Sequence, residues 1–280
     1  AVKRFKDRDK FYIPHSFDYR GRTYPIPAFL TPQDTDFGKS LLKFADESMM
    51  TPEAEDWLRF QVATTFGLDK APIEERLEWV LDNEELITCV VTDPILHIHL
   101  WEGVEEPFQF LAACEEYYHC VLVADRQFTC LPVATDATCS GLQILAGLAR
   151  DKSTARLVNV LPSPRPQDAY KVVAETAKPF VPESIRQYMD RKVVKRVVMT
   201  VPYNAKPFSN RGYIKDALKD KDIEIDKDDL TKTVKAVRDA MDEVVPGPMA
   251  VMSWIESEVG KAIDRGETEL TWVTPSGFKV

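Results

Sequence analysis

Asp136 is a candidate for metal chemistry, because it follows an apolar stretch at residues 129–135. That stretch predicts a buried strand ending at the aspartate, and the end of a strand holds a carboxylate in a fixed position. The carboxylate of Asp136 and the backbone carbonyl of Ala137 would offer Mg²⁺ two hard oxygen ligands, and water and phosphate oxygens would supply the rest. An aspartate at such a corner is more often a helix cap or a turn residue, so this position alone leaves both interpretations open.

A second candidate is a cationic stripe on a predicted helix. Arg191 and Lys195 are four residues apart and therefore share one helical face, with Arg196 beside them. The series continues to Tyr203, although Pro202 must distort the last turn. Cations neutralise the phosphates of a nucleoside triphosphate, and an aromatic ring can meet its sugar and base. A solvated basic helix is the alternative, and the spacing does not decide between the two.

A third group lies near the N-terminus, where Arg20 and Arg22 flank Gly21 and Tyr24 follows. Guanidinium groups bind phosphates in a fork geometry, and aromatic rings stack on bases, so this group suits a nucleic-acid strand. A turn held by pairing between arginine and Asp18 is the structural alternative.

The composition fits a soluble globular protein of one large domain or two smaller ones, with 280 residues, 44% hydrophobic and 29% charged. No apolar run reaches the roughly 20 residues that cross a bilayer, so we expect no membrane partner. Five cysteines without a CxxC pair argue against a disulfide framework or a zinc site. The net charge is −9, yet residues 186–215 carry eight cations against one anion, and residues 1–22 carry seven against three. Two basic stretches in an acidic chain indicate two surfaces that contact polyanions.

The elements that must position these residues are mostly helical, so we expect an α+β fold dominated by helices. Short strands and loops are expected over 1–46, a loop over 219–229, and a strand and turn over 272–278. Ser140 and Gln143 fit a capping box for a helix at 141–150. The other predicted helices span 52–66, 73–90, 166–178, 183–201 and 230–264.

At this point the motifs resemble those of a known family, the single-subunit, phage-type RNA polymerases of phages, mitochondria and plastids. Three patterns carry the resemblance in the correct order: a template-contact motif at Asp18-x-Arg20-Gly21-Arg22, motif A at Asp136-x-x-x-Ser140-Gly141, and motif B from Arg191 through Lys195 to Tyr203. The resemblance implies a partial polymerase right hand of the DNA polymerase I-like superfamily. It divides the chain into a palm segment at 1–46, a helical insertion at 47–126, a palm segment with motif A at 127–164 and fingers at 165–280.

The same resemblance implies roles for single residues. Asp136 and the carbonyl of Ala137 would bind Mg²⁺, and Asp136, Lys195 and Tyr203 would be catalytic. The nucleotide would be bound by Lys70, Tyr170, Arg191, Lys195, Arg196 and Tyr203. The template or hybrid would be contacted by Arg20, Arg22 and Tyr24. The partners would be a DNA template, nascent RNA and ribonucleoside triphosphates, and the protein would be a monomer. Asn204 stands where the family has glycine, so the helix must end without glycine's freedom at positive φ, although Asn is the next best choice.

Gly141 favours RNA over DNA synthesis, because a residue without a side chain leaves room for the ribose 2′-hydroxyl. Two-metal nucleotidyl transfer also needs a second carboxylate, which the family supplies in a His-Asp motif; this sequence contains no His-Asp pair. We therefore expect the chain to be a fragment with little activity of its own. The alternatives are a DNA polymerase I-like enzyme and a non-catalytic remnant that binds nucleic acid. The expected location is a bacterial host cytoplasm, with an organelle as the alternative.

Overall fold

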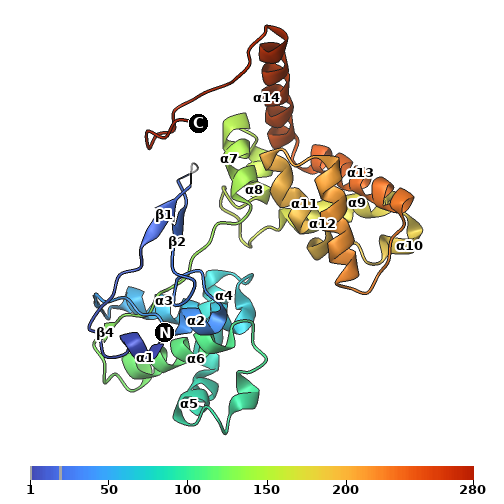
Figure 1. The fold of residues 1–280 in the computed structure, drawn as a ribbon. Coiled ribbons are helices and arrows are strands. Elements are labelled where there is room, and N and C mark those ends of the chain that lie inside the picture. Colours follow the sequence, from blue (N-terminus) through green and yellow to red (C-terminus); the bar gives the residue numbers. More distant parts are fainter. Residues whose placement is uncertain (1, 19–20) are drawn as a thin grey trace. The chain divides into compact units, whose positions relative to one another are not determined.

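The computed structural model describes residues 2–18 and 21–280, and most of its regular structure is helical (Figure 1). The chain folds as two compact units, each with its own apolar core. Unit 1 comprises Ala1–Thr135 together with Thr271–Val280, and unit 2 comprises Asp136–Leu270. The expected helix-dominated α+β class is confirmed.

Unit 1 has helices around a compact core and two small antiparallel strand pairs. Its buried centre is formed by Leu58, Ile87, Phe110 and Tyr117. Strands β1 and β2 pair with each other, as do β3 and β4, and residues 271–280 add a single bridge between Val273 and Lys279. The helices of unit 1 are α1 (Val2–Phe5), α2 (Asp36–Ser40), α3 (Pro52–Ala63), α4 (Ile73–Asp82), α5 (Glu84–Thr92) and α6 (Pro107–Tyr117), with π turns at Thr64–Leu68 and Tyr118–Leu122 and a 3₁₀ turn at Ile98–Leu100. The strands are β1 (His15–Phe17), β2 (Thr23–Pro25), β3 (Ser48–Met49) and β4 (Phe128–Thr129).

The helix predicted at 52–66 is confirmed, but the one predicted at 73–90 is two helices. Thr51 caps α3 by accepting a hydrogen bond from the Ala54 amide, and Pro52 occupies the first turn, where no amide hydrogen is needed. Asn83 separates α4 from α5 with φ −118° and ψ 22°, outside the helical region. Its side chain donates to the carbonyl of Trp79 at 2.7 Å. Asparagine competes for backbone groups in this way, and so it ends helices that apolar periodicity alone would continue.

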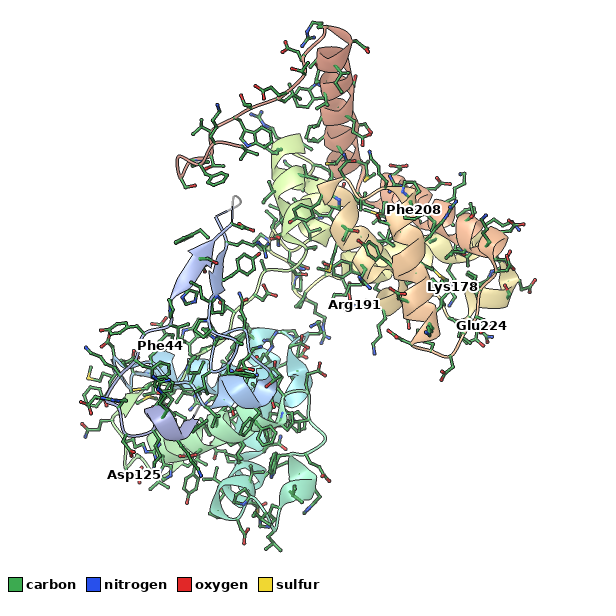
Figure 2. All side chains as sticks on the ribbon, viewed as in Figure 1. Phe44, Asp125, Lys178, Arg191, Phe208 and Glu224 are labelled. Atoms are coloured by element: carbon green, nitrogen blue, oxygen red, sulfur yellow. The ribbon has the colours of Figure 1, made fainter. Side chains whose placement is uncertain are left out.

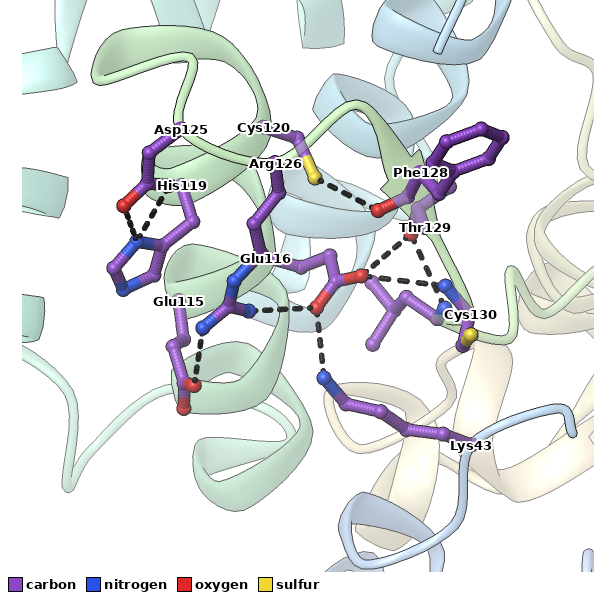
Figure 3. A network of polar contacts seen from close by, with 11 residues as sticks. Lys43, Glu115, Glu116, His119, Cys120, Asp125, Arg126, Phe128, Thr129 and Cys130 are labelled. Atoms are coloured by element: carbon purple, nitrogen blue, oxygen red, sulfur yellow. Dashed lines mark hydrogen bonds and ion pairs between the residues drawn. The ribbon is translucent and has the colours of Figure 1, made fainter. Parts of the chain in front are cut away.

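A buried carboxylate, Glu116 of α6, links β4 to the rest of unit 1 through hydrogen bonds and ion pairs (Figure 3). Its side chain is 3% exposed, and it pairs with Lys43 at 2.8 Å and Arg126 at 3.6 Å. It also accepts hydrogen bonds from the Thr129 hydroxyl at 2.7 Å and the Cys130 amide at 3.3 Å. Burial opposes ionisation of Glu116, but the bonds from Lys43 and Thr129 outweigh it and lower the pKa of the carboxyl.

The strand predicted over 129–135 is wrong beyond its first residue. Only Phe128 and Thr129 form a strand, and residues 130–137 are neither helix nor strand. Pro132 has no amide hydrogen to give to a neighbouring strand. Side chains bond to this backbone instead: besides Glu116, Gln61 accepts from the Ala134 amide at 3.1 Å. Asp136 therefore follows an irregular segment rather than a buried strand.

Unit 2 is a packed group of helices. Its core is built from Val193, Val194, Val197 and Val198 of α11 together with apolar residues of α9, α12 and α13. The helices are α7 (Ser140–Ala149), α8 (Lys152–Leu157), α9 (Ala169–Ala177), α10 (Glu183–Arg186), α11 (Arg191–Thr200), α12 (Pro207–Lys219), α13 (Lys227–Val244) and α14 (Pro246–Asp264), with 3₁₀ turns at Lys178–Phe180 and Val201–Tyr203.

Two long predicted helices of unit 2 are broken in the structure. The prediction for 183–201 becomes α10 and α11, because Asp190 caps α11 by accepting from the amides of Lys192 and Val193. The prediction for 230–264 becomes α13 and α14, because Pro246 cannot continue a helix and begins a new one. Helix α12 was not predicted, and the expected loop at 219–229 is shorter, since α13 begins at Lys227.

Candidate active site

Asp136 lies on the surface just before α7. One of its carboxylate oxygens, Oδ1, accepts a hydrogen bond from the Ala137 amide at 2.8 Å. The chain then turns at Cys139, which has φ 44° and ψ 49°, and α7 begins at Ser140. The predicted capping box is wrong, because the side chain of Gln143 donates to the Val158 carbonyl at 2.7 Å instead of reaching back to the helix start. Asp136 thus lies in an irregular segment and not at the end of a strand.

The first turn of α7 lies against the aromatic residue at the end of motif B. A Cβ atom added at Gly141 would lie 3.1 Å from Cβ of Pro202 and 3.2 Å from Cε2 of Tyr203. Both distances are shorter than ordinary van der Waals contacts, so a side chain at 141 would displace the tyrosine ring. Gly141 is the fifth residue after Asp136. Motifs A and B, which are far apart in the sequence, therefore meet at this contact.

Arg191, which is labelled in Figure 2, begins α11 and contacts two residues at the start of α9, Asp168 and Tyr170. Its Nε donates to the carboxylate of Asp168 at 2.7 Å, and its guanidinium carbon lies 5.2 Å from the centre of the Tyr170 ring. Asp168 also caps α9 by accepting from the amides of Tyr170 and Lys171. The cation predicted to bind a triphosphate is therefore already paired with a carboxylate.

Tyr170 lies beneath Arg191 and is 4% exposed. Burial, and next the neighbouring Cys139 thiol, raises the pKa of Tyr170 to about 12. Burial also raises the pKa of Cys139. Both groups are thus neutral at neutral pH, and Tyr170 offers Arg191 an aromatic face without a charge.

The other two cations of α11 that were predicted to bind the triphosphate differ in their surroundings. Arg196 stacks on the ring of Tyr213 at 4.4 Å and pairs with Asp216 at 3.4 Å, both from α12. Lys195 is exposed and forms no ion pair within the described part of the chain. Of the three cations in α11 predicted to bind the triphosphate, Lys195 can meet a phosphate without first breaking an ion pair.

The backbone turns directly after Tyr203. Asn204 has φ 65° and ψ 29°, in the left-handed region, which asparagine tolerates best after glycine. Its amide donates to the carbonyl of Val201 at 2.8 Å. The tyrosine ring itself is 59% exposed. Pro202 lies within a 3₁₀ turn, which ends the helix and lets Tyr203 face α7.

The residues around Asp136 fit one half of a magnesium site. A carboxylate oxygen and the Ala137 carbonyl are the hard ligands that this ion prefers. Within residues 2–18 and 21–280, however, no three His, Cys, Asp or Glu side chains are close enough together to hold a metal ion. Asp136 and the Ala137 carbonyl are therefore candidate metal ligands, and their role in a metal site stays a prediction.

The remaining candidates belong to unit 1. Lys70 pairs with its neighbour Asp69, whose backbone carbonyl accepts from the buried Arg76 at 2.7 Å. Arg22 directly precedes β2, and its amide donates to the Asp18 carboxylate at 3.0 Å. Tyr24 in β2 donates to the same carboxylate at 3.4 Å. Arg20 lies outside the described residues.

Sequence reasoning missed the role of Asp168. An aspartate directly before a helix commonly serves as an N-cap, and the predicted helix start at 166 hid that signal. The pairing of Asp168 with Arg191 depends on how α9 packs beside α11, and no local pattern shows this.

Comparison with known proteins identifies the family. The family model described as DNA-dependent RNA polymerase matches residues 48–280. The human mitochondrial DNA-directed RNA polymerase is 33% identical over 98% of this chain, and a tobacco mitochondrial enzyme (1B) is 29% identical over all of it. The chain spans 24% and 30% of the length of these two relatives. Every helix in the described residues is too short or too polar to span a membrane. The predicted resemblance to phage-type, single-subunit enzymes is confirmed, and the chain belongs to the DNA-dependent RNA polymerase family.

Proposed function

We propose that this chain acts in DNA-templated RNA synthesis by two-metal nucleotidyl transfer from ribonucleoside triphosphates. One observation carries the proposal: Gly141, in the first turn after the motif A aspartate, lies in contact distance of Tyr203 at the end of motif B. Motif A, which would supply an aspartate for a metal, and motif B, which would supply an aromatic ring for the sugar, are in contact at this point. The position between them has no side chain, which leaves room for a 2′-hydroxyl.

Each candidate residue would have its own role in nucleotidyl transfer. Asp136 and the Ala137 carbonyl would hold Mg²⁺, which supplies electrostatic stabilisation of the reacting phosphate. Lys195, Arg191 and Arg196 would neutralise the triphosphate, and Tyr170 would support Arg191 from below. Tyr203 would contact the sugar. Lys70 would approach the triphosphate, and Arg20, Arg22 and Tyr24 would contact the template or hybrid.

The right-hand arrangement is part of the same proposal. We place palm segments at 1–46 and 127–164, the helical insertion at 47–126 and the fingers at 165–280. The partners would be a DNA template, nascent RNA and ribonucleotides, and the protein would act as a monomer. The names of the human and tobacco relatives favour the organellar alternative over the bacterial cytoplasm.

Template-directed RNA synthesis by the full gene product tests the function. Asp136→Asn should abolish synthesis while DNA binding persists, because it removes a metal ligand and no DNA contact. Tyr203→Phe should relax the preference for ribonucleotides over deoxynucleotides. Residues 1–280 alone should be inactive, since the chain has no His-Asp pair. Synthesis by the Asp136→Asn variant would overturn the metal assignment, and an enzyme that prefers deoxynucleotides would instead support a DNA polymerase I-like activity.

A further inference from the structure

A small groove between α12 and α13 is lined by positively charged side chains, none of which belongs to the candidate active site. Its volume is about 240 Å³, and its charged lining residues are Arg211 of α12 and Lys235, Arg238 and Asp239 of α13. Lys235 pairs with Asp239. Neither arginine forms an ion pair within the described residues, so two guanidinium charges remain uncompensated in one groove.

The position of Arg238 is fixed by buried partners. Its Nη1 donates to the Asn210 side-chain oxygen at 2.9 Å and to the Ala205 carbonyl at 3.1 Å. Asn210 is fully buried, so its oxygen cannot move to follow a mobile arginine. Both acceptors are neutral. They orient the guanidinium and leave its charge for a ligand outside the fold.

Arg211 lacks acceptors of its own. Its Nε is shielded from solvent and has no hydrogen-bond partner among the described residues. Buried polar groups are nearly always hydrogen-bonded, so an orphaned guanidinium nitrogen indicates that an acceptor is missing. The groove also adjoins the start of α12, at Pro207, where no side chain caps the helix. The positive end of the helix dipole adds to the attraction for an anion.

The geometry points to a binding site for a backbone phosphate of DNA or RNA, held by Arg211 and Arg238. Guanidinium groups bind phosphate oxygens through paired hydrogen bonds. Small-molecule pockets usually measure roughly 300–1,000 Å³, so the groove suits a single phosphate group better than a whole nucleotide. None of the described residues lining it is aromatic, so it has no ring to stack on a base. We therefore expect affinity without sequence preference.

This site rests on the proposed function, since a nucleic-acid strand must pass over unit 2. It adds a contact outside the motifs, on helices that none of the sequence motifs includes. Arg238 lies beyond the basic stretch 186–215, and only the packing of α12 against α13 brings it to Arg211.

The test is the salt dependence of binding to a short fluorescein-labelled DNA duplex, measured by anisotropy with the 280-residue chain. Each lost phosphate contact should reduce the slope of log K against log salt by about 0.9. Between about 50 and 200 mM salt, the loss of affinity for Arg211→Gln should therefore be about 3.5-fold smaller than for the wild type. Arg211→Lys should keep the wild-type slope, because it keeps the charge, but bind more weakly.

Arg265→Gln is the matched control, because it removes the same charge from an exposed arginine at the end of α14. It should leave the slope unchanged. If the Arg211→Gln slope equals that of the wild type, the groove is not a phosphate site, whatever the polymerase activity shows. If the wild-type chain binds no duplex at any salt concentration, the groove proposal and the proposed DNA contact both fail. Circular dichroism of each variant shows that a changed slope does not arise from unfolding.

Discussion

The contact between Gly141 and Tyr203 predicts how two glycines of one helix respond to the same substitution. Helix α7 contains Gly141 and Gly147, and a Cβ atom at Gly147 would meet nothing within 4 Å. Replacing a helical glycine with alanine gains about 0.5–1 kcal/mol in the absence of strain. We therefore expect Gly147→Ala to raise the free energy of unfolding by about that amount.

Gly141→Ala should behave differently, because its new methyl group would lie 3.1 Å from Pro202 and 3.2 Å from the tyrosine ring. Inserting a methyl group into a filled space costs about 1–3 kcal/mol. The gain in helix propensity is then cancelled or outweighed, so Gly141→Ala should be less stable than Gly147→Ala by about 1–3 kcal/mol. Because the ring of Tyr203 is largely exposed, part of the strain can be relieved by moving it.

Urea unfolding followed by circular dichroism measures both variants. Repeating the pair in a Tyr203→Ala background isolates the ring, and the penalty at 141 should shrink there, although Pro202 remains. Equal stabilisation by the two glycine substitutions in the wild-type background would refute the contact. An unchanged penalty in the Tyr203→Ala background would assign the strain to Pro202 alone.

Substitutions at three further positions test other parts of the fold. Asn204→Ala should lower the free energy of unfolding by about 1 kcal/mol, because alanine is strained at positive φ. Asn204→Gly should leave the stability unchanged or raise it. Thermal unfolding of both variants checks this, and equal melting temperatures would contradict it. Asp151 accepts hydrogen bonds from the Ser153 and Thr154 amides at the start of α8 and from the Gly247 amide at the start of α14. Asp151→Ala should therefore lower the free energy of unfolding by about 1–2 kcal/mol, measured with urea. An unchanged free energy would argue that these bonds do not stabilise the two helix starts. Glu116 has a lowered pKa in the folded state, so its stabilisation is complete above the ordinary glutamate pKa of about 4.3 and is lost as the pH falls through the folded value. Glu116→Gln should therefore cost stability at neutral pH and flatten the acid side of the stability profile, and a profile parallel to the wild type would be the contrary result.

The sequence predicted the existence of the helices better than their ends. The helical pattern identified α3, α11 and α13, because their buried faces recur at the helical spacing, whereas α7 was predicted from a capping box that the structure does not form. The breaks at Asn83, Asp190 and Pro246 depend on capping and on a missing amide hydrogen, and periodicity does not register either. Helix α12 was missed because its apolar residues are few, and its burial comes from packing against α11 and α13.

The candidate site divides in a similar way. Residue type and spacing were enough to name Asp136, Lys195 and Tyr203 as candidates. The sequence could not show that Arg191 pairs with Asp168, or that Gly141 lies against Tyr203. Both contacts join segments that are distant along the chain, and only the packing of helices determines them.

The ion pair between Arg191 and Asp168 has a consequence for how a phosphate would be taken up there. A ligand at Arg191 must exchange places with an anion that the protein itself supplies, whereas at Lys195 it displaces only solvent ions. When a ligand replaces Asp168 at Arg191, few mobile ions are released, so binding at Arg191 should depend weakly on ionic strength. The internal carboxylate is a fixed competitor: weak anions would not replace it, and a highly charged triphosphate would. Selectivity for the more charged ligand would then come from the ion pair that Arg191 and Asp168 form in the absence of ligand.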